Sequence, residues 1–260
     1  MVQFAANLTM LFNEVEFLDR FNAAAKAGFK GVEYLFPYDF EKAELAERLK
    51  ANKLKQVLFN TPAGNWGAGE RGLACRPDRV DEFREGVARA IDYAKALGCV
   101  QLHCMAGLTP EGVEAAKIRK TYVENLRHAA GEMKKAGIRC LMEMINTRDI
   151  PGFYLNTSAQ AEELLKEIAS DNVFLQYDIY HMQIMEGDLA PTMQRLLPKI
   201  AHMQLADTPG RNEPGTGEIN YPFLFAHLDR IGYKGWIGCE YKPAKATLEG
   251  LGWIKPYLKA

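Results

Sequence analysis

Three carboxylate side chains close apolar segments of the chain, and they are the residues best suited to chemistry. Glu143 ends Cys-Leu-Met-Glu, Asp178 ends Leu-Gln-Tyr-Asp and Glu240 ends Ile-Gly-Cys-Glu. A strand that is buried on both faces is expected to be apolar throughout. One such carboxylate is explained equally well by a salt bridge or a helix cap. Three in equivalent positions favour a shared site.

A divalent metal ion is the simplest way to hold these groups together. Carboxylates that converge on one barrel mouth repel each other unless a cation neutralises them. The amide oxygen of Gln204 completes an all-oxygen ligand set with Glu143, Asp178 and Glu240. Such a set suits Mg²⁺ or Mn²⁺ better than zinc. Glu143 and Glu240 are also a pair that could exchange protons with a carbon acid whose oxygens the metal polarises.

His181 and Arg211 are the first candidates for holding a substrate. His181 follows Asp178 by three residues, so both could face one ligand if the chain turns after the strand. The alternative is a structural imidazole. Arg211 lies in a segment too rich in glycine and proline to be a helix. Its guanidinium could bind a substrate carboxylate through two parallel hydrogen bonds, the alternative being an ion pair with Glu213 or Glu218.

Four more polar residues are weaker candidates near the same strand ends. Lys242 and Arg71 could contact a substrate anion, although a solvated surface lysine is the competing interpretation of the first. His103 closes a strand and could line the pocket or be satisfied in the core. His202 lies two residues before Gln204, which places both on the same side of a strand.

The elements that position these residues alternate regularly along the chain. Short β-rich segments predict eight strands, over residues 3–8, 31–35, 54–60, 100–104, 138–143, 173–178, 200–205 and 236–240. Segments of helical period predict eight helices, over residues 14–27, 39–52, 78–97, 111–136, 158–169, 188–197, 221–231 and 247–258. A capping-box pattern, Thr157-x-x-Gln160, supports the start of the fifth helix.

Strict alternation of eight strands and eight helices predicts an α/β fold, a single (β/α)8 TIM barrel domain over residues 1–260. An open doubly wound sheet is the alternative, but no Gly-x-Gly-x-x-Gly follows the first strand. Long loops follow the third, fifth and seventh strands, over residues 61–77, 144–157 and 206–220. In a barrel these loops share the face at the carboxyl ends of the strands, where active sites lie.

Composition narrows the class of partner. The 260 residues are 48% apolar and 25% charged, as in an ordinary globular protein. The 32 basic and 33 acidic residues leave a net charge of −1, which predicts neither nucleic acid nor a membrane as partner. Five cysteines without CxxC spacing, and no recognisable targeting signal, predict a cytoplasmic protein with reduced thiols. A homo-oligomer is compatible with this composition.

Five segments closely resemble the hydroxypyruvate isomerase family of the xylose-isomerase-like barrels. They are Phe-Asn-Thr-Pro-Ala-Gly-Asn-Trp-Gly-Ala-Gly-Glu-Arg-Gly (59–72), Ile-Asn-Thr-Arg-Asp-Ile-Pro-Gly-Phe (145–153), Gln-Tyr-Asp-Ile-Tyr-His-Met-Gln (176–183), the run 209–221 ending Gly-Thr-Gly-Glu-Ile-Asn-Tyr, and Gly-Cys-Glu-Tyr-Lys-Pro (238–243). The resemblance runs from Phe4 to Trp253.

The resemblance implies interconversion of hydroxypyruvate and 2-hydroxy-3-oxopropanoate (tartronate semialdehyde), an oxo-acid reaction of glyoxylate metabolism. It matches Glu143 and Glu240 to the family's catalytic glutamates, and Glu143, Asp178, Gln204 and Glu240 to its metal positions. Relatives that act on sugars often have histidine where Gln204 stands, and related isomerases commonly have proline where Met144 follows Glu143.

Other functions on the same barrel remain open at this stage. A 2-oxo-tetronate isomerase or a ketose 3-epimerase would use the same two glutamates with different pocket walls. A zinc-dependent endonuclease of abasic DNA would need a histidine-rich multi-metal cluster and a basic face, which five histidines and a net charge of −1 do not provide. A non-catalytic binding barrel would not need two opposed glutamates.

Overall fold

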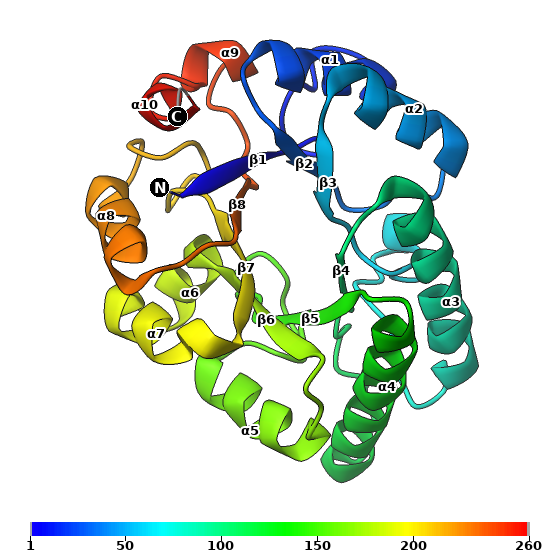
Figure 1. Ribbon diagram of the computed structural model, residues 1–260. Helices are drawn as coiled ribbons and strands as arrows, with labels where there is room; N and C mark the ends of the chain where they lie inside the picture. Colours follow the sequence, from blue (N-terminus) through cyan, green and yellow to red (C-terminus); the bar gives the residue numbers. More distant parts are fainter. Residues whose placement is uncertain (1, 259–260) are drawn as a thin grey trace.

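Eight parallel strands form the inner wall of the molecule. A computed structural model describes residues 2–258 and shows a ring of strands inside a ring of helices (Figure 1). The strands are β1 (Gln3–Asn7), β2 (Gly31–Glu33), β3 (Lys55–Leu58), β4 (Gln101–His103), β5 (Arg139–Glu143), β6 (Val173–Asp178), β7 (Ile200–Leu205) and β8 (Trp236–Cys239). Their hydrogen-bonded order is β3-β2-β1-β8-β7-β6-β5-β4, and a bridge between Asn60 and His103 joins its two ends. The predicted TIM barrel is confirmed.

Helices cover the outside of the barrel. They are α1 (Phe17–Lys26), α2 (Lys42–Asn52), α3 (Val80–Leu97), α4 (Ala115–Lys135), α5 (Ser158–Ile168), α6 (Ile179–Met185), α7 (Leu189–Leu196), α8 (Tyr221–Ile231), α9 (Thr247–Gly250) and α10 (Lys255–Leu258), with 3₁₀ turns at Trp66–Ala68 and Leu197–Lys199. The main hydrophobic core lies between these helices and the strands. None of the helices within residues 2–258 is long and apolar enough to cross a bilayer.

Two helical predictions are corrected by the structure. The single helix predicted over residues 247–258 is two short helices, α9 and α10, separated by a turn at Gly252. Helix α6 was missed because it begins directly after β6, with no loop between them. Asp178 makes this possible, since its Oδ1 accepts a hydrogen bond from the Tyr180 backbone N–H at 2.8 Å and caps the helix.

Other local predictions hold. The Thr157 hydroxyl accepts from the Gln160 backbone N–H at 3.2 Å, and the Gln160 side chain accepts in return from the backbone N–H of Asn156. The five cysteines are all buried and unpaired, as expected of reduced thiols. Gly98 follows α3 with a φ of +64°, a left-handed conformation that favours glycine.

Alternation along the strands sorts the barrel interior into layers. Side chains on one face of a strand recur every second residue. Along β5 the inward positions are therefore Arg139, Leu141 and Glu143, from the amino end to the carboxyl end. Polar groups occupy the carboxyl-end layer, whereas the middle is packed by a separate apolar cluster, Ala5, Val57, Leu58, Leu141 and Ala201 with Phe174 and Trp236. This cluster forms the floor of the site.

The loops after β3, β4 and β5 are tied to one another over the carboxyl-end face. Gly72 pairs with Ala106, and Leu108 pairs with Phe153. Gly107 lies between these two bridges with a φ of +101°, and an added Cβ would come 2.4 Å from the Gly72 carbonyl oxygen. Only glycine fits this crossing point.

We therefore expect Gly107→Ala to lower the free energy of unfolding by about 2–3 kcal/mol, since it adds both backbone strain and a clash. Gly98→Ala is the matched control, because Gly98 also has a positive φ but no heavy atom within 4 Å of its added Cβ. Denaturant unfolding should show a loss of about 1 kcal/mol for the control. Equal losses in the two variants would contradict the close approach of the loops.

Candidate active site

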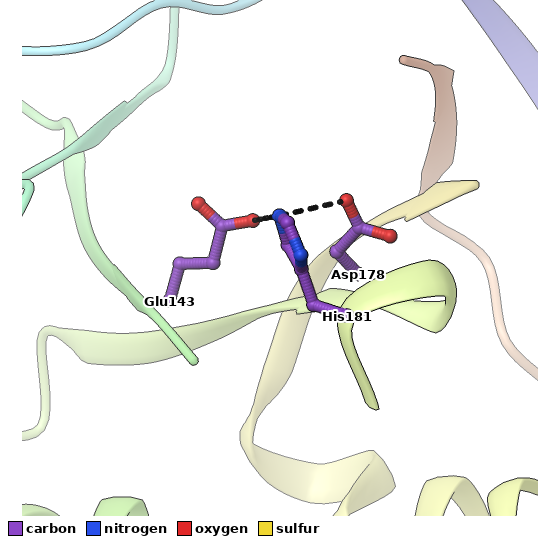
Figure 2. Close-up of side chains that lie close together, drawn as sticks. All are labelled: Glu143, Asp178 and His181. Atoms are coloured by element: carbon purple, nitrogen blue, oxygen red, sulfur yellow. Dashed lines mark ion pairs between the residues drawn. The ribbon is translucent and has the colours of Figure 1, made fainter. Parts of the chain in front are cut away.

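The polar residues at the strand ends meet in one buried network. Glu143 and Asp178 lie on either side of His181, as Figure 2 shows. The Nε2 atom of His181 is 3.9 Å from Glu143 Oε1 and 3.6 Å from Asp178 Oδ2. His103 Nδ1 is 3.6 Å from the other Glu143 oxygen. Residues from the carboxyl ends of β4, β5 and β6 and from the start of α6 are thus brought together.

Glu143 and Asp178 each present an oxygen that has no partner. Glu143 Oε1 and Asp178 Oδ2 are buried and accept no hydrogen bond within the described residues. Burial, followed by the charges of Glu240 and Asp178, raises the pKa of Glu143 well above its ordinary value. Burial likewise raises the pKa of Asp178 to about 6, although the Arg211 charge acts in the opposite direction. Two unpaired acceptors aimed at one space call for a cation or a donor.

Glu240 accepts more hydrogen bonds than Glu143 does. Its Oε1 accepts from Arg211 Nη2 at 2.8 Å, and its Oε2 accepts from Asn7 Nδ2 at 3.0 Å and Gln204 Nε2 at 2.6 Å. Burial nonetheless raises the pKa of Glu240 to about 8, against the opposing charge of Arg211. Both glutamates therefore hold a proton more tightly than an exposed carboxyl does, which suits an acid and base working near neutral pH.

Glu33 is a fourth buried carboxylate, and the sequence analysis did not assign it to the site. Its Oε1 accepts from the same Asn7 and Gln204 amide groups that bind Glu240, at 3.0 and 2.7 Å. Its Oε2 lies 2.7 Å from His202 Nε2. Four groups thus close a ring of hydrogen bonds, Glu33, Asn7, Glu240 and Gln204. A Cβ at Gly238 would come 2.2 Å from Glu33 Oε1, so glycine leaves room for this carboxylate.

Gln204 and Gln176 connect the ring to Glu143. Both amide hydrogens of Gln204 are used by Glu33 and Glu240, so its Oε1 faces Gln176, whose Nε2 lies 2.6 Å away. Gln176 is also the residue paired with Glu143 in the register of β5 and β6. Sequence reasoning missed Gln176, although period two places it inward, two residues before Asp178.

His181 is held in one tautomer by Asn146. The Asn146 side-chain oxygen accepts from the Asp149 backbone N–H at 2.7 Å, which leaves its amide nitrogen 2.6 Å from His181 Nδ1. Nδ1 is then the acceptor, and Nε2 carries the proton toward the carboxylates. Burial lowers the pKa of His181 well below its ordinary value, so the ring is neutral. This arrangement suits a hydrogen-bond donor to a substrate oxygen.

Arg211 is drawn into the site instead of stabilising its own loop. Its two terminal nitrogens donate to Asp149 at 3.0 Å and to Glu240 at 2.8 Å. Its guanidinium carbon lies 5.2 Å from the centre of the Tyr180 ring. The alternative partners weighed from the sequence have other donors: Glu213 accepts from the Ala244 backbone N–H at 3.0 Å, and Glu218 accepts from Gln183 Nε2 at 3.3 Å. Arg211 itself has a φ of +55°, an unfavourable backbone conformation for a residue with a side chain.

A cavity of about 600 Å³ opens above these groups. Arg71, Lys242 and His103 all line it. The guanidinium of Arg71 lies 4.1 Å from the centre of the Trp66 ring and donates to the backbone oxygens of Trp66 and Glu70. Neither Arg71 nor Lys242 pairs with a carboxylate among residues 2–258.

The donor set fits a divalent cation. Ligand atoms of Glu143, Asp178 and His181 all lie within 4.8 Å of one another and are buried. The unpaired oxygens of the two carboxylates, and the repulsion that raises their pKa values, are what a cation would relieve. The oxygens of Glu240 and Gln204, also predicted as ligands, are occupied by Arg211, Asn7 and Gln176 in this arrangement.

The fold and the site together define an enzyme-type α/β barrel. A family model described as "Xylose isomerase-like TIM barrel" matches residues 21–257. A solved structure described as AP endonuclease, family 2, from Brucella melitensis superimposes with a TM-score of 0.97 at 48% identity, covering 99% of each chain. The protein is therefore a xylose isomerase-like TIM barrel.

Two relatives narrow the family further. Hydroxypyruvate isomerase of Escherichia coli is 53% identical over 257 residues, covering 99% of this chain and all of that protein. The 2-oxo-tetronate isomerase of Cupriavidus necator is 51% identical over 258 residues and covers 99% of both chains. The chain belongs to the family of hydroxypyruvate and 2-oxo-tetronate isomerases.

The raised carboxylate pKa values predict how pH and metal affect stability. Above about pH 6.5 the folded protein still keeps the proton on Glu240 that the unfolded chain has released, and the raised pKa of Glu143 acts in the same direction. The free energy of unfolding of metal-free protein should therefore fall between about pH 6.5 and pH 8, by on the order of 2 kcal/mol. Below about pH 6.5 the buried His103 and His181 stay neutral, because burial lowers their pKa values, whereas histidines of the unfolded chain take up protons. These two residues therefore lower the free energy of unfolding as the pH falls.

Thermal unfolding in EDTA across this pH range, repeated with Mg²⁺ or Mn²⁺, checks the prediction. Metal should raise the Tm more at pH 8 than at pH 6.5, because deprotonated carboxylates bind it. Asp178→Asn should reduce the response. A Tm that is independent of added metal at both pH values would be evidence against the site.

Proposed function

We propose that the protein is an isomerase of short hydroxy-oxo-acids that interconverts hydroxypyruvate and 2-hydroxy-3-oxopropanoate. One observation carries the proposal: two glutamates from different strands, both with raised pKa, meet at a single cavity that also holds unpaired cations. Aldose–ketose isomerisation of a carboxylate substrate needs such a pair and such cations.

The reaction is a proton transfer between neighbouring carbons. One glutamate, Glu143 or Glu240, removes a proton from C3 of hydroxypyruvate, and the electron pair forms an enediolate between C2 and C3. The other glutamate delivers a proton to C2. The C3 hydroxyl loses its proton as it becomes the aldehyde, and the C2 oxygen gains one. His181 is placed to donate to a substrate oxygen through Nε2.

We assign Glu143, Asp178, Gln204 and Glu240 to a divalent ion, Mg²⁺ or Mn²⁺; Glu143 and Asp178 are the two whose unpaired oxygens lie close together. His181, whose Nε2 carries a proton, stays a hydrogen-bond donor beside this set. Such an ion would neutralise the carboxylates and polarise the two substrate oxygens. Glu33 and Asn7 act as positioning residues, because they hold Glu240 in place from below.

Substrate binding is assigned to Arg211, Arg71 and Lys242 with His181. Arg211 already shares its charge between Asp149 and Glu240, so it links substrate binding to the state of Glu240. The Arg71 guanidinium packs on the Trp66 ring and has no carboxylate partner within residues 2–258, and it lines the cavity with Lys242. A substrate carboxylate held by Arg71 would keep C2 and C3 over the glutamates.

The second candidate is a 2-oxo-tetronate isomerase, favoured by the 51% identical relative of that name. The substrate of a ketose 3-epimerase has no carboxylate that could pair with Arg71 and Lys242. Abasic-DNA cleavage, suggested by the description of the Brucella protein, needs several metal ions and a basic face. The metal-type cluster found in residues 2–258 has one histidine.

The deciding assay offers hydroxypyruvate, 2-oxo-tetronate and a free ketohexose to the same preparation, with and without chelator. Hydroxypyruvate should give the highest kcat/KM. Higher kcat/KM with 2-oxo-tetronate would establish the second candidate, and turnover of the ketohexose alone would overturn the oxo-acid assignment.

Replacing either glutamate by glutamine should stop turnover without unfolding the barrel. Glu143→Gln and Glu240→Gln keep the shape of the side chain but cannot carry a proton, so kcat should fall by at least about a hundredfold. Steady-state kinetics and thermal unfolding measure the two effects. Retention of more than about a tenth of the activity in one variant would remove that residue from proton transfer.

Arg71 and Arg211 should be separable by kinetics. Arg71→Lys loses the planar fork but touches no catalytic group, so KM should rise several-fold with kcat little changed. Arg211→Lys disturbs Glu240 as well, so kcat should fall and KM rise. Arg148→Lys, an exposed arginine in the loop after β5, is the control. If both variants keep the kcat/KM of the control, neither arginine binds substrate.

A further inference from the structure

A second cavity lies at the opposite end of the barrel from the candidate active site. It has a volume of about 790 Å³ and is lined where β3, β4, β5, β7 and β8 begin. Along β5 its residue Arg139 precedes Glu143 by four positions, about 13 Å at the rise of a strand. The apolar cluster of the barrel interior separates the two cavities.

The charged residues that line this cavity are all basic. Lys55, Arg139 and Lys234 line it, and no Asp or Glu is among its lining residues. Within residues 2–258 none of the three cations makes an ion pair or side-chain hydrogen bond. Lys55 and Lys234 are exposed and Arg139 is half-buried, so positive charge surrounds the entrance. Such an entrance attracts small anions.

Two buried amide groups supply an independent observation. Gln56 and Gln101 are 4% and 2% exposed, line the same cavity, and each has an Oε1 atom without a hydrogen-bond partner. The Gln56 amide nitrogen is already committed to the Leu58 carbonyl at 2.9 Å, which fixes its oxygen as the free group. Unpaired buried acceptors are costly, and a ligand that donates hydrogen bonds would satisfy them.

We propose that this cavity is a second binding site, for a small anion that carries hydroxyl groups. The anionic head is held by Arg139 with Lys55 and Lys234, and the hydroxyls donate to Gln56 and Gln101. Tyr233 and Trp236 form a wall, with the Tyr233 hydroxyl donating to the Trp236 carbonyl at 2.8 Å. Carboxylate and phosphate heads share this chemistry, and the test distinguishes them.

The tryptophans provide a reporter for each cavity. The chain has three of them: Trp236 lines the second cavity, Trp66 lines the candidate active site, and Trp253 lines neither. Protein labelled with fluorotryptophan therefore gives one fluorine NMR signal for each location, assigned by single Trp→Phe variants. Glycerate, glycerol 3-phosphate, acetate and glycerol are the probes, titrated to about 10 mM.

Glycerate or glycerol 3-phosphate should shift the Trp236 signal saturably, with a Kd at least about fivefold below that of acetate, and glycerol should not shift it. The tighter of the two hydroxylated anions identifies the head group. Two variants should each raise the Kd of the hydroxylated anion about tenfold or more. One is Arg139→Gln, and the other combines Lys55→Ala with Lys234→Ala at exposed positions. Lys30→Ala, an exposed lysine before β2 outside the cavity, should leave it unchanged.

Three results would overturn the proposal. They are a Trp236 signal that none of the probes moves, a shift that survives in both folded cation variants, and acetate binding as tightly as the hydroxylated anions. Thermal unfolding confirms that each variant is folded. Because the Trp66 signal and turnover are measured separately, failure here is distinguishable from failure of the proposed isomerase function.

Discussion

Burial of carboxylates at one end of a closed barrel is the constraint on which the rest of the site depends. Glu33, Glu143, Asp178 and Glu240 are all at most 7% exposed and lie within one hydrogen-bonded network. Charged groups in such surroundings must be paired, protonated or bound to a cation. The structure shows pairing, because amide donors and Arg211 bind Glu33 and Glu240. It also favours protonation, because the pKa values of Glu143 and Glu240 are raised.

The barrel can bury these carboxylates together because its interior is divided into layers. Period-two alternation places carboxylates and amides in the carboxyl-end layer and apolar side chains in the layer beneath. Closure of the sheet through the Asn60–His103 bridge holds β3 against β4, so the network has a continuous wall. The loops then add Arg71 and Arg211 from above.

The strand-end residues could be predicted from sequence because polar residues interrupt apolar segments at fixed places. That rule found Glu143, Asp178 and Glu240. Glu33 was not assigned to the site, because its role depends on which strands face each other across the barrel. The partner of Arg211, Asp149, is 62 residues away, and such a pairing has no local signal. Helix α6 was missed for a different reason, because it begins at Ile179 directly after β6 ends at Asp178 and no loop marks the boundary.

Proton transfer through the buried glutamates is the central claim, and exchange with solvent tests it most directly. Turnover of hydroxypyruvate in deuterated water, followed by NMR of both acids, reports whether the migrating hydrogen reaches a side chain. Glutamate-mediated transfer predicts deuterium at C2 of the product, and at C3 of recovered substrate when the reaction reverses. Complete retention of hydrogen at both carbons throughout turnover would contradict the account and indicate a direct hydride shift.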